Sequence, residues 1–189
     1  MMPTLDFLNQ RRSTPARLLG EPAPSRSQLE AMFAAAMRVP DHGALTPWRV
    51  LLIEGQARHR LGEFLVERSL ALKPGASAVQ LEKERLRFAR APLVLVVIAS
   101  LHASAKVPEV EQILSAGNVC FSLLQAAQAL GFGAQWLTGW AAYDDAVMAH
   151  LGLSGSERIV GFIHLGTPQQ PTPERRRPDW QAHVSVWQG

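Results

Sequence analysis

Residues 108–139 read PEVEQILSAGNVCFSLLQAAQALGFGAQWLTG, a long helical pattern followed by a short apolar segment between glycines. Apolar side chains recur at helical spacing, and further apolar residues occupy other angles of the same helix. Such a wide apolar surface predicts a helix that is buried on more than one side, and one of those sides could face a partner subunit. Ser115, Ala116 and Gly117 would let another backbone approach closely. Gly131 and Gly133 then end the helix and open a strand through Trp136.

The remaining apolar segments predict alternating helices and strands. Residues 93–98, LVLVVI, lack polar alternation, which is typical of a strand covered on both faces, so we expect it at the centre of the sheet. Further strands are expected over Val50–Ile53 and Ile159–Leu165. The expected helices run from Thr4 to Arg12, Ser27 to Met37, Gln56 to Leu72, Ala76 to Arg90 and Asp144 to Leu151.

Two local signals refine these boundaries. Ser27 and Glu30 have the spacing of a capping box at the start of the second helix. The proline- and arginine-rich tail after Pro168 is expected to be extended.

Length and composition favour one globular domain over residues 1–189. The chain is 47% hydrophobic and 19% charged, with a net charge of +3. The single cysteine and the lack of a secretory leader predict a cytoplasmic protein, and no membrane span is expected. The charge leaves a nucleic-acid-binding module as an alternative, although the basic residues are dispersed among acids without an aromatic platform.

Arg11, Arg12 and Ser13 form the first chemically suggestive group. Guanidinium groups are rigid forks that match phosphate oxygens, and the hydroxyl adds a donor, so this tripeptide suits a phosphomonoester. The other interpretation is a solvated helix end, with cations placed favourably at the negative end of the helix dipole.

A second group stands where a helix stops before a strand: Arg38, Pro40, Asp41, His42, Pro47 and Trp48. His42 can hydrogen-bond a heteroaromatic ring, and Trp48 offers a flat surface, although a loop histidine and a core tryptophan would look the same. No second ligand lies at a useful spacing from His42, so no metal site is predicted.

The third group is residues 131–139, GFGAQWLTG. Glycines around a strand suggest a backbone that lies against something flat. The order helix, glycines, strand is the reverse of a dinucleotide-binding fingerprint. No hydrolase triad, paired carboxylates or P-loop stands out, and Cys120 is expected to be an inert packing residue.

Taken in order, these groups resemble the nitroreductase family of FMN-dependent oxidoreductases. The resemblance also includes Arg90-Ala91-Pro92, Ser115-Ala116-Gly117, Ile159-Val160-Gly161-Phe162 and Leu165-Gly166-Thr167-Pro168, and it covers nearly the whole chain. It implies an α+β fold with a central, mainly antiparallel sheet wrapped by helices. It also implies an intertwined homodimer with two FMN sites across the interface.

The resemblance assigns roles to individual residues. Arg11, Arg12 and Ser13 resemble the binders of the ribityl phosphate, and Arg38 and His42 resemble residues that contact FMN from the same or the facing subunit. The backbone N–H near Thr138 or Gly139 would bond flavin N5, and no side chain is expected to be catalytic. The full set of expected FMN contacts is Arg11, Arg12, Ser13, Arg38, His42, Pro47, Trp48, Trp136, Leu137, Thr138, Gly139, Arg175 and Arg177. The expected NAD(P)H segment is Ala126, Ala127, Gln128, Ala129, Leu130 and Gly131.

The implied activity is a ping-pong cycle in which NADH or NADPH gives hydride to flavin N5 and an electrophilic acceptor then takes it. A nitroaromatic, a quinone or an enone would serve as acceptor. A relative specialised for dehalogenation or flavin breakdown stays open as an alternative. The chain departs from many relatives at Ala44 and Thr46, where an Asn and a Gln often touch the flavin, and Arg175 or Arg177 could reach the phosphate or be solvated.

Overall fold

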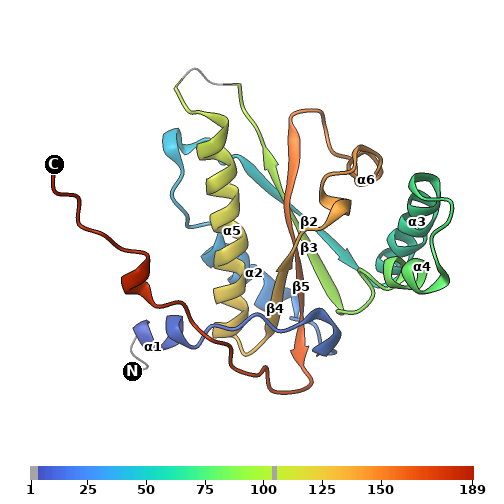
Figure 1. Ribbon diagram of the computed structural model, residues 1–189, viewed down its shortest axis with the longest axis horizontal. Coiled ribbons are helices and arrows are strands. Elements are labelled where there is room, and N and C mark those ends of the chain that lie inside the picture. Colours follow the sequence, from blue (N-terminus) through green and yellow to red (C-terminus); the bar gives the residue numbers. More distant parts are fainter. Residues whose placement is uncertain (1–3, 104–105) are drawn as a thin grey trace.

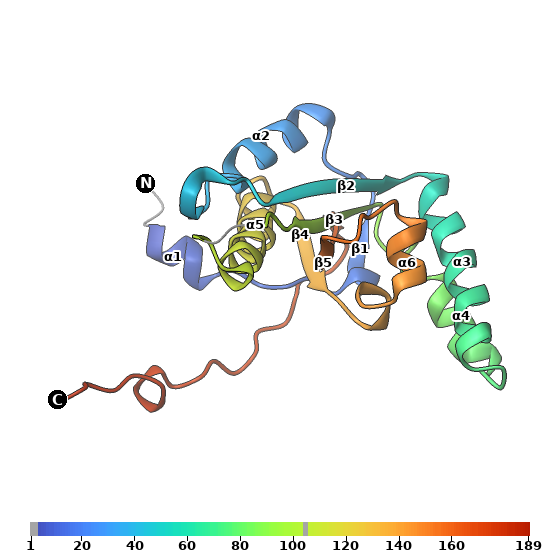
Figure 2. The same ribbon diagram turned by 90° about the horizontal axis from the view of Figure 1, so that it is seen from above.

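The computed structural model describes residues 4–103 and 106–189, in which helices cover both faces of an antiparallel sheet (Figures 1 and 2). The strands are β1 (Leu19–Gly20), β2 (Trp48–Glu54), β3 (Leu93–Ser100), β4 (Gly133–Leu137) and β5 (Glu157–Pro168). The α-helices are α1 (Thr4–Asn9), α2 (Arg26–Ala36), α3 (Gln56–Leu72), α4 (Ala78–Arg85), α5 (Glu109–Ala129) and α6 (Asp145–His150). Short 3₁₀ turns are η1 (Ala16–Leu18), η2 (His42–Ala44), η3 (Trp140–Ala142) and η4 (Trp180–Ala182).

The sheet has β3 and β5 at its centre. β3 pairs with β2 on one edge and with β5 on the other, and every pairing is antiparallel. β4 pairs with the same stretch of β5 that β3 does, so it must lie along the opposite edge of β5. The predicted central position of residues 93–98 and the predicted α+β class are therefore confirmed.

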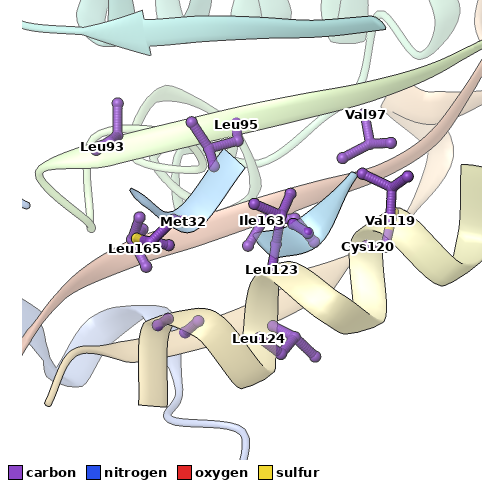
Figure 3. Packing of buried hydrophobic residues seen from close by; sticks show 13 residues of the cluster. Met32, Leu93, Leu95, Val97, Val119, Cys120, Leu123, Leu124, Ile163 and Leu165 are labelled. Carbon is purple, nitrogen blue, oxygen red and sulfur yellow. The ribbon is translucent and has the colours of Figure 1, made fainter. Parts of the chain in front are cut away.

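Two hydrophobic cores lie on the two faces of this sheet. Leu93, Leu95 and Val97 of β3 join the cluster under α2 and α5, which Figure 3 shows from close by. The alternate residues of β3 join the cluster under α3, α6 and η3. Because side chains alternate across a strand, the uninterrupted apolar run supplies both cores at once.

The capping box of α2 is shifted from its predicted place. Ser25, not Ser27, is the N-cap: its hydroxyl accepts from the Gln28 backbone N–H at 3.3 Å, and the Gln28 side chain accepts from the Ser25 N–H at 2.8 Å. The prediction of Ser27 with Glu30 is wrong because Ser27 already lies in the first helical turn. Glu30 instead pairs with Arg26 at 3.2 Å.

Other boundaries differ by several residues. α1 ends at Asn9 and not at Arg12, and α4 is shorter than predicted because Ser77 caps it and turns follow Arg85. The strand at 159–165 extends over all of β5, and β1 was not predicted, since two residues carry no detectable alternation. Gly131, with φ of 82°, ends α5 as expected.

Cys120 is fully buried in the core under α5, and burial raises the pKa of its thiol to about 12. The thiol therefore stays protonated and serves as a packing group. Across the described residues, no helix is both long and apolar enough to cross a bilayer.

Candidate functional site

Four arginines from the two ends of the chain gather at one place beside α1. Burial lowers the pKa of Arg11, and the charges of Arg177, Arg12 and Arg175 lower it further, which shows that these four cations lie close together. Arg177 Nη2 donates to the Arg11 carbonyl oxygen at 3.4 Å, and Arg11 Nη1 donates to the Ser13 hydroxyl at the same distance. We call Arg11, Arg12, Arg175 and Arg177 the terminal arginine cluster.

One carboxylate lies within this cluster. Glu174 Oε1 is 3.0 Å from Arg12 Nη1 and 3.1 Å from Arg177 Nη2. The N–H of Arg175, followed by the charges of Arg12 and Arg177, lowers the Glu174 pKa. Arg12 Nη1 is buried, and its 3.0 Å ion pair with Glu174 is not aligned as a hydrogen bond. Four guanidinium groups with one carboxylate among them fit a phosphate, which offers more oxygens and more charge than one carboxylate does.

β4 runs directly beside the terminal arginine cluster. The Thr14 N–H donates to the Ala134 carbonyl at 3.0 Å, and the Ala16 N–H donates to Gln135 Oε1 at 2.7 Å. The indole of Trp136 lies against Gly161, where a Cβ would approach its ring nitrogen to 2.0 Å, and its Nε1 donates to the Val160 carbonyl at 3.1 Å. β4 thus carries a fixed, partly exposed aromatic surface away from the arginines.

The backbone changes direction just after β4. Gly139 has φ of 78° and ψ of −178°, a conformation that a residue with a Cβ rarely adopts. Leu137 and Trp136 are each more than a third exposed at this end of the strand. Residues 138 and 139 therefore lie at the end of an exposed ledge, which Trp136 and Leu137 form.

The His42 loop lies at the other end of α5. His42 Nδ1 is 2.7 Å from Glu111 Oε2, and the Ser115 hydroxyl donates to the Pro40 carbonyl at 2.6 Å. Ala44 and Thr46 both have positive φ, 51° and 46°, although neither is glycine. The Asp41 carboxylate holds this strained loop by accepting from the N–H groups of residues 45 and 46 at 3.2 and 2.8 Å. Strain of this kind is common where a loop is shaped for a ligand.

The comparisons with known proteins agree with one another. The nitroreductase family model matches residues 8–167 of this chain. The chain belongs to the nitroreductase family. It is 39% identical over 168 residues to "Putative NAD(P)H nitroreductase YdjA" of Escherichia coli, covering 89% of this chain and 90% of that one. It is 36% identical over 172 residues to "Putative NAD(P)H nitroreductase" of Haemophilus influenzae, covering 88% and 89%. The predicted family and enzyme class are thus confirmed.

Solved structures confirm the nitroreductase fold. A nitroreductase-like family protein from Bacillus cereus superposes with a TM-score of 0.83 at 19% identity, covering 100% of this chain and 98% of that one. A putative nitroreductase from Desulfovibrio desulfuricans, solved in complex with FMN, gives a TM-score of 0.73 at 22% identity, with 98% of each chain covered. At these identities the likeness establishes the fold alone.

Within this nitroreductase fold, the predicted FMN contacts separate into two groups. The terminal arginine cluster, Ser13 and β4 lie together, whereas Arg38 and the His42 loop lie near the start of α5. Two side chains mark the two ends of α5. Glu111 at the start contacts His42, and Gln128 at the end donates from Nε2 to the Phe7 carbonyl at 3.1 Å. They are separated by about 25 Å at 1.5 Å per residue, so one protomer does not bring the two groups together. Pro47 is buried and Trp48 packs partly against the core under α5.

The predicted NAD(P)H segment, residues 126–131, lies at the end of α5 that is close to α1. Ala127 is fully buried in the core, and Gln128 holds α1, whereas Ala129, Leu130 and Gly131 are exposed. The contact with NAD(P)H stays a prediction, and only the exposed members of the segment have side chains or backbone available for it.

A second group of cations was not predicted. Arg17, Lys83, Arg87 and Arg90 line a hollow of about 330 Å³ on the other face of β4, next to Gln135 and Leu137. Nothing in the local sequence of residues 82–87 indicates that this charged run lies against β4. Among described residues, no group of three or more His, Cys, Asp and Glu side chains could hold a metal ion.

Proposed function

We propose that this nitroreductase-family protein is a homodimeric, FMN-dependent oxidoreductase that takes reducing equivalents from NAD(P)H and delivers them to an electrophilic small molecule. A nitroaromatic, a quinone or an enone has the required chemistry. The family match and the names of the relatives support FMN and NAD(P)H as cofactors. The observation that carries the proposal is the gathering of four arginines around the single carboxylate of Glu174 in the terminal arginine cluster.

The terminal arginine cluster would hold the phosphate of FMN. Arg12 is held in place, with its side chain only 17% exposed, so it loses little freedom when it binds an anion. Ser13 is exposed beside it and adds a hydroxyl donor. Glu174 occupies part of the same space, and a phosphate would displace this carboxylate or share the arginines with it.

Trp136, Leu137 and the N–H groups of residues 138 and 139 would support the isoalloxazine ring. Bound FMN supplies hydride transfer between the nicotinamide and the acceptor. The ledge at the end of β4 orients the ring, and the hydrogen bond from Trp136 to Val160 keeps the indole from rotating. No side-chain acid or base is required of this chain.

A second copy of the chain would complete the site. If two α5 helices pack antiparallel, the start of one lies beside the end of the other, which brings Arg38 and His42 of one protomer to the terminal arginine cluster of its partner. α5 offers a suitable surface, since Val110, Ile113, Leu114 and Phe121 are 39–61% exposed along it. This arrangement favours the facing subunit as the source of the His42 contact.

The cores on the two faces of the sheet share the strands β3 and β5, which supports one domain over residues 1–189. The cytoplasm remains the expected compartment. Dehalogenation, flavin breakdown and nucleic-acid binding remain as alternatives. NAD(P)H consumption measured with several acceptors separates the redox alternatives, whereas a colourless protein that binds nucleic acid with a steep salt dependence would favour the last one.

The decisive experiment is a flavin titration of the purified protein, followed by fluorescence quenching. Wild-type protein should bind FMN, and Arg12→Ala should weaken binding by about 1.5–3 kcal/mol, the value of a lost charged hydrogen bond. Arg26→Ala is the matched control, because the Arg26 side chain is 94% exposed and pairs with Glu30 on its own helix. Equal FMN affinity in wild type and Arg12→Ala would refute the assignment of the phosphate site.

A further inference from the structure

We propose that Glu174 is an internal competitor of the FMN phosphate: its carboxylate and the phosphate bind the same arginines, so FMN must displace Glu174 from the terminal arginine cluster. This inference rests on the proposed function and adds to it the residue that limits the affinity of the site for phosphate. The sequence does not indicate this role, because Glu174 is one acid in an arginine-rich tail and lies far along the chain from Arg12.

The carboxylate of Glu174 is bound much as a phosphate oxygen would be. Its Oε1 lies 3.0 Å from Arg12 Nη1 and 3.1 Å from Arg177 Nη2, and it also accepts from the Arg175 N–H at 2.9 Å. This N–H, followed by the charges of the two arginines, lowers the pKa of Glu174, so the side chain is negative at neutral pH. One anionic oxygen between two guanidinium groups is an arrangement typical of bound phosphate.

The phosphate and the carboxylate cannot both hold this position. A phosphomonoester carries a charge of about −1.5 to −2 at pH 7. Bound to Arg12 with Glu174 still in place, it would bring two like charges within a few ångströms of each other, which is unfavourable. The phosphate is the stronger ligand, because it has more oxygens for the four arginines and because the contact of Glu174 with Arg12 is not aligned as a hydrogen bond. Glu174 is therefore the group that leaves.

The tail can release Glu174 without disturbing either hydrophobic core. Thr172 is the last residue of the tail that is partly buried, and its hydroxyl donates to the Thr14 hydroxyl at 3.1 Å. Residues 173–189 are all exposed, and the polar contacts that they make with the rest of the described chain end in the terminal arginine cluster. Figures 1 and 2 show the last part of the tail extending away from the sheet and helices. Rotation of the chain after Thr172 is enough to remove the carboxylate.

This competition affects only a ligand that carries a phosphate. Riboflavin has the same ring and ribityl chain as FMN but no phosphate, so it can bind while Glu174 stays on Arg12 and Arg177. For FMN, part of the attraction between the phosphate and the arginines is offset by the loss of two ion pairs. Neutralising Glu174 should therefore strengthen the binding of FMN and leave the binding of riboflavin unchanged.

The test is a pair of fluorescence titrations of Glu174→Gln, one with FMN and one with riboflavin. The dissociation constant of FMN should fall roughly fivefold, a modest change because exposed ion pairs are weak. The dissociation constant of riboflavin should stay at the wild-type value. Inorganic phosphate, measured by its competition with FMN, should also bind more tightly to Glu174→Gln than to wild type. Circular dichroism checks that the variant is folded, which is expected because the Glu174 side chain is 69% exposed.

Glu30→Gln is the matched control. It changes the net charge of the protein by the same amount, and the Glu30 side chain is 67% exposed and pairs at 3.2 Å with Arg26 on its own helix. It should leave the dissociation constants of FMN, riboflavin and inorganic phosphate at their wild-type values. A gain in FMN affinity in Glu30→Gln equal to that in Glu174→Gln would show that net charge alone is responsible, and would overturn the inference.

The outcomes separate this inference from the proposed function. If wild-type protein binds no FMN, the proposed function fails and the inference falls with it. If wild type binds FMN but Glu174→Gln binds it equally or more weakly, only the inference is overturned, because Glu174 then shares the arginines or holds them in place for the phosphate. An equal gain for FMN and riboflavin would also overturn it, since the effect would then not act through the phosphate.

Discussion

The two long helices α3 and α5 pack against opposite faces of the same sheet but differ on their outer sides. The exposed positions over the first three turns of α3 are polar: Gln56, His59, Arg60, Glu63 and Glu67. Those of α5 include Val110, Ile113, Leu114 and Phe121. A helix with one apolar face buries that face fully when it packs on the sheet. α5 has a second apolar face that the sheet does not cover, and such a face is typical of a protein–protein interface.

The largest expected effect is on assembly. Replacing Leu114, 61% exposed on α5, with Glu would bury a charge at the proposed interface and should weaken dimerisation at least a hundredfold. Sedimentation velocity over a concentration series measures this, with Leu72→Glu on α3 as the matched control, since Leu72 is 56% exposed. A Leu114→Glu protein that assembles like wild type would remove α5 from the interface.

The second test compares the cores beneath the two helices. Leu123 under α5 and Leu65 under α3 are both fully buried, so each Leu→Ala change should cost about 3 kcal/mol of unfolding free energy. In a dimer built on α5, the wild-type melting temperature should rise with protein concentration. Urea unfolding and scanning calorimetry measure these quantities, and equal stability at all concentrations would count against the dimer.

The third test concerns pH and the α3 face, where His164 is buried. Burial, followed by the charge of Arg87, lowers the pKa of His164 from 6.5 to about 4. The folded state favours neutral His164. Its contribution to the unfolding free energy is therefore complete above the unfolded pKa of 6.5 and is lost as the pH falls from 6.5 toward the folded pKa of about 4. Between pH 7 and pH 5 the loss should be about 2 kcal/mol.

Variants isolate this contribution of His164. Urea unfolding of His164→Leu should lack this pH dependence, while His183→Gln on the exposed tail should keep it. Glu157 does not interfere, because the hydrogen bond from Arg49 lowers its pKa to about 2 and its contribution is lost only below about pH 4.5. An unchanged pH profile in His164→Leu would show that another group dominates.

The smallest expected effect is at α2, which packs beside α5. Ser25→Ala removes the N-cap and should cost about 1 kcal/mol, whereas Ser27→Ala in the first turn should change stability by less than about 0.5 kcal/mol. Thermal unfolding of both variants checks the order. The reverse order would restore the capping box predicted from the sequence.

Much of the fold was accessible from local pattern. The unbroken apolar run 93–98 predicted the central strand, because only a strand covered on both faces tolerates apolar residues at every position. The wide apolar surface of residues 108–130 predicted a helix buried on more than one side. The local sequence could not decide whether Ser25 or Ser27 is the N-cap of α2, because each serine has a glutamine or glutamate three residues later. The N-cap is the last residue with extended backbone after Pro24, and the structure shows that this residue is Ser25.

The candidate site divides in the same way. The sequence by itself determined the family, through short motifs in a characteristic order, and determined that Arg11-Arg12-Ser13 suits a phosphate, because that chemistry resides in adjacent side chains. Only the tertiary structure decided that Arg177 joins Arg11 from 166 residues away, that Arg87 lies against Gly139, and that His42 lies at the far end of α5. Local sequence specifies which groups a segment carries, whereas long-range packing of strands and helices specifies which groups meet.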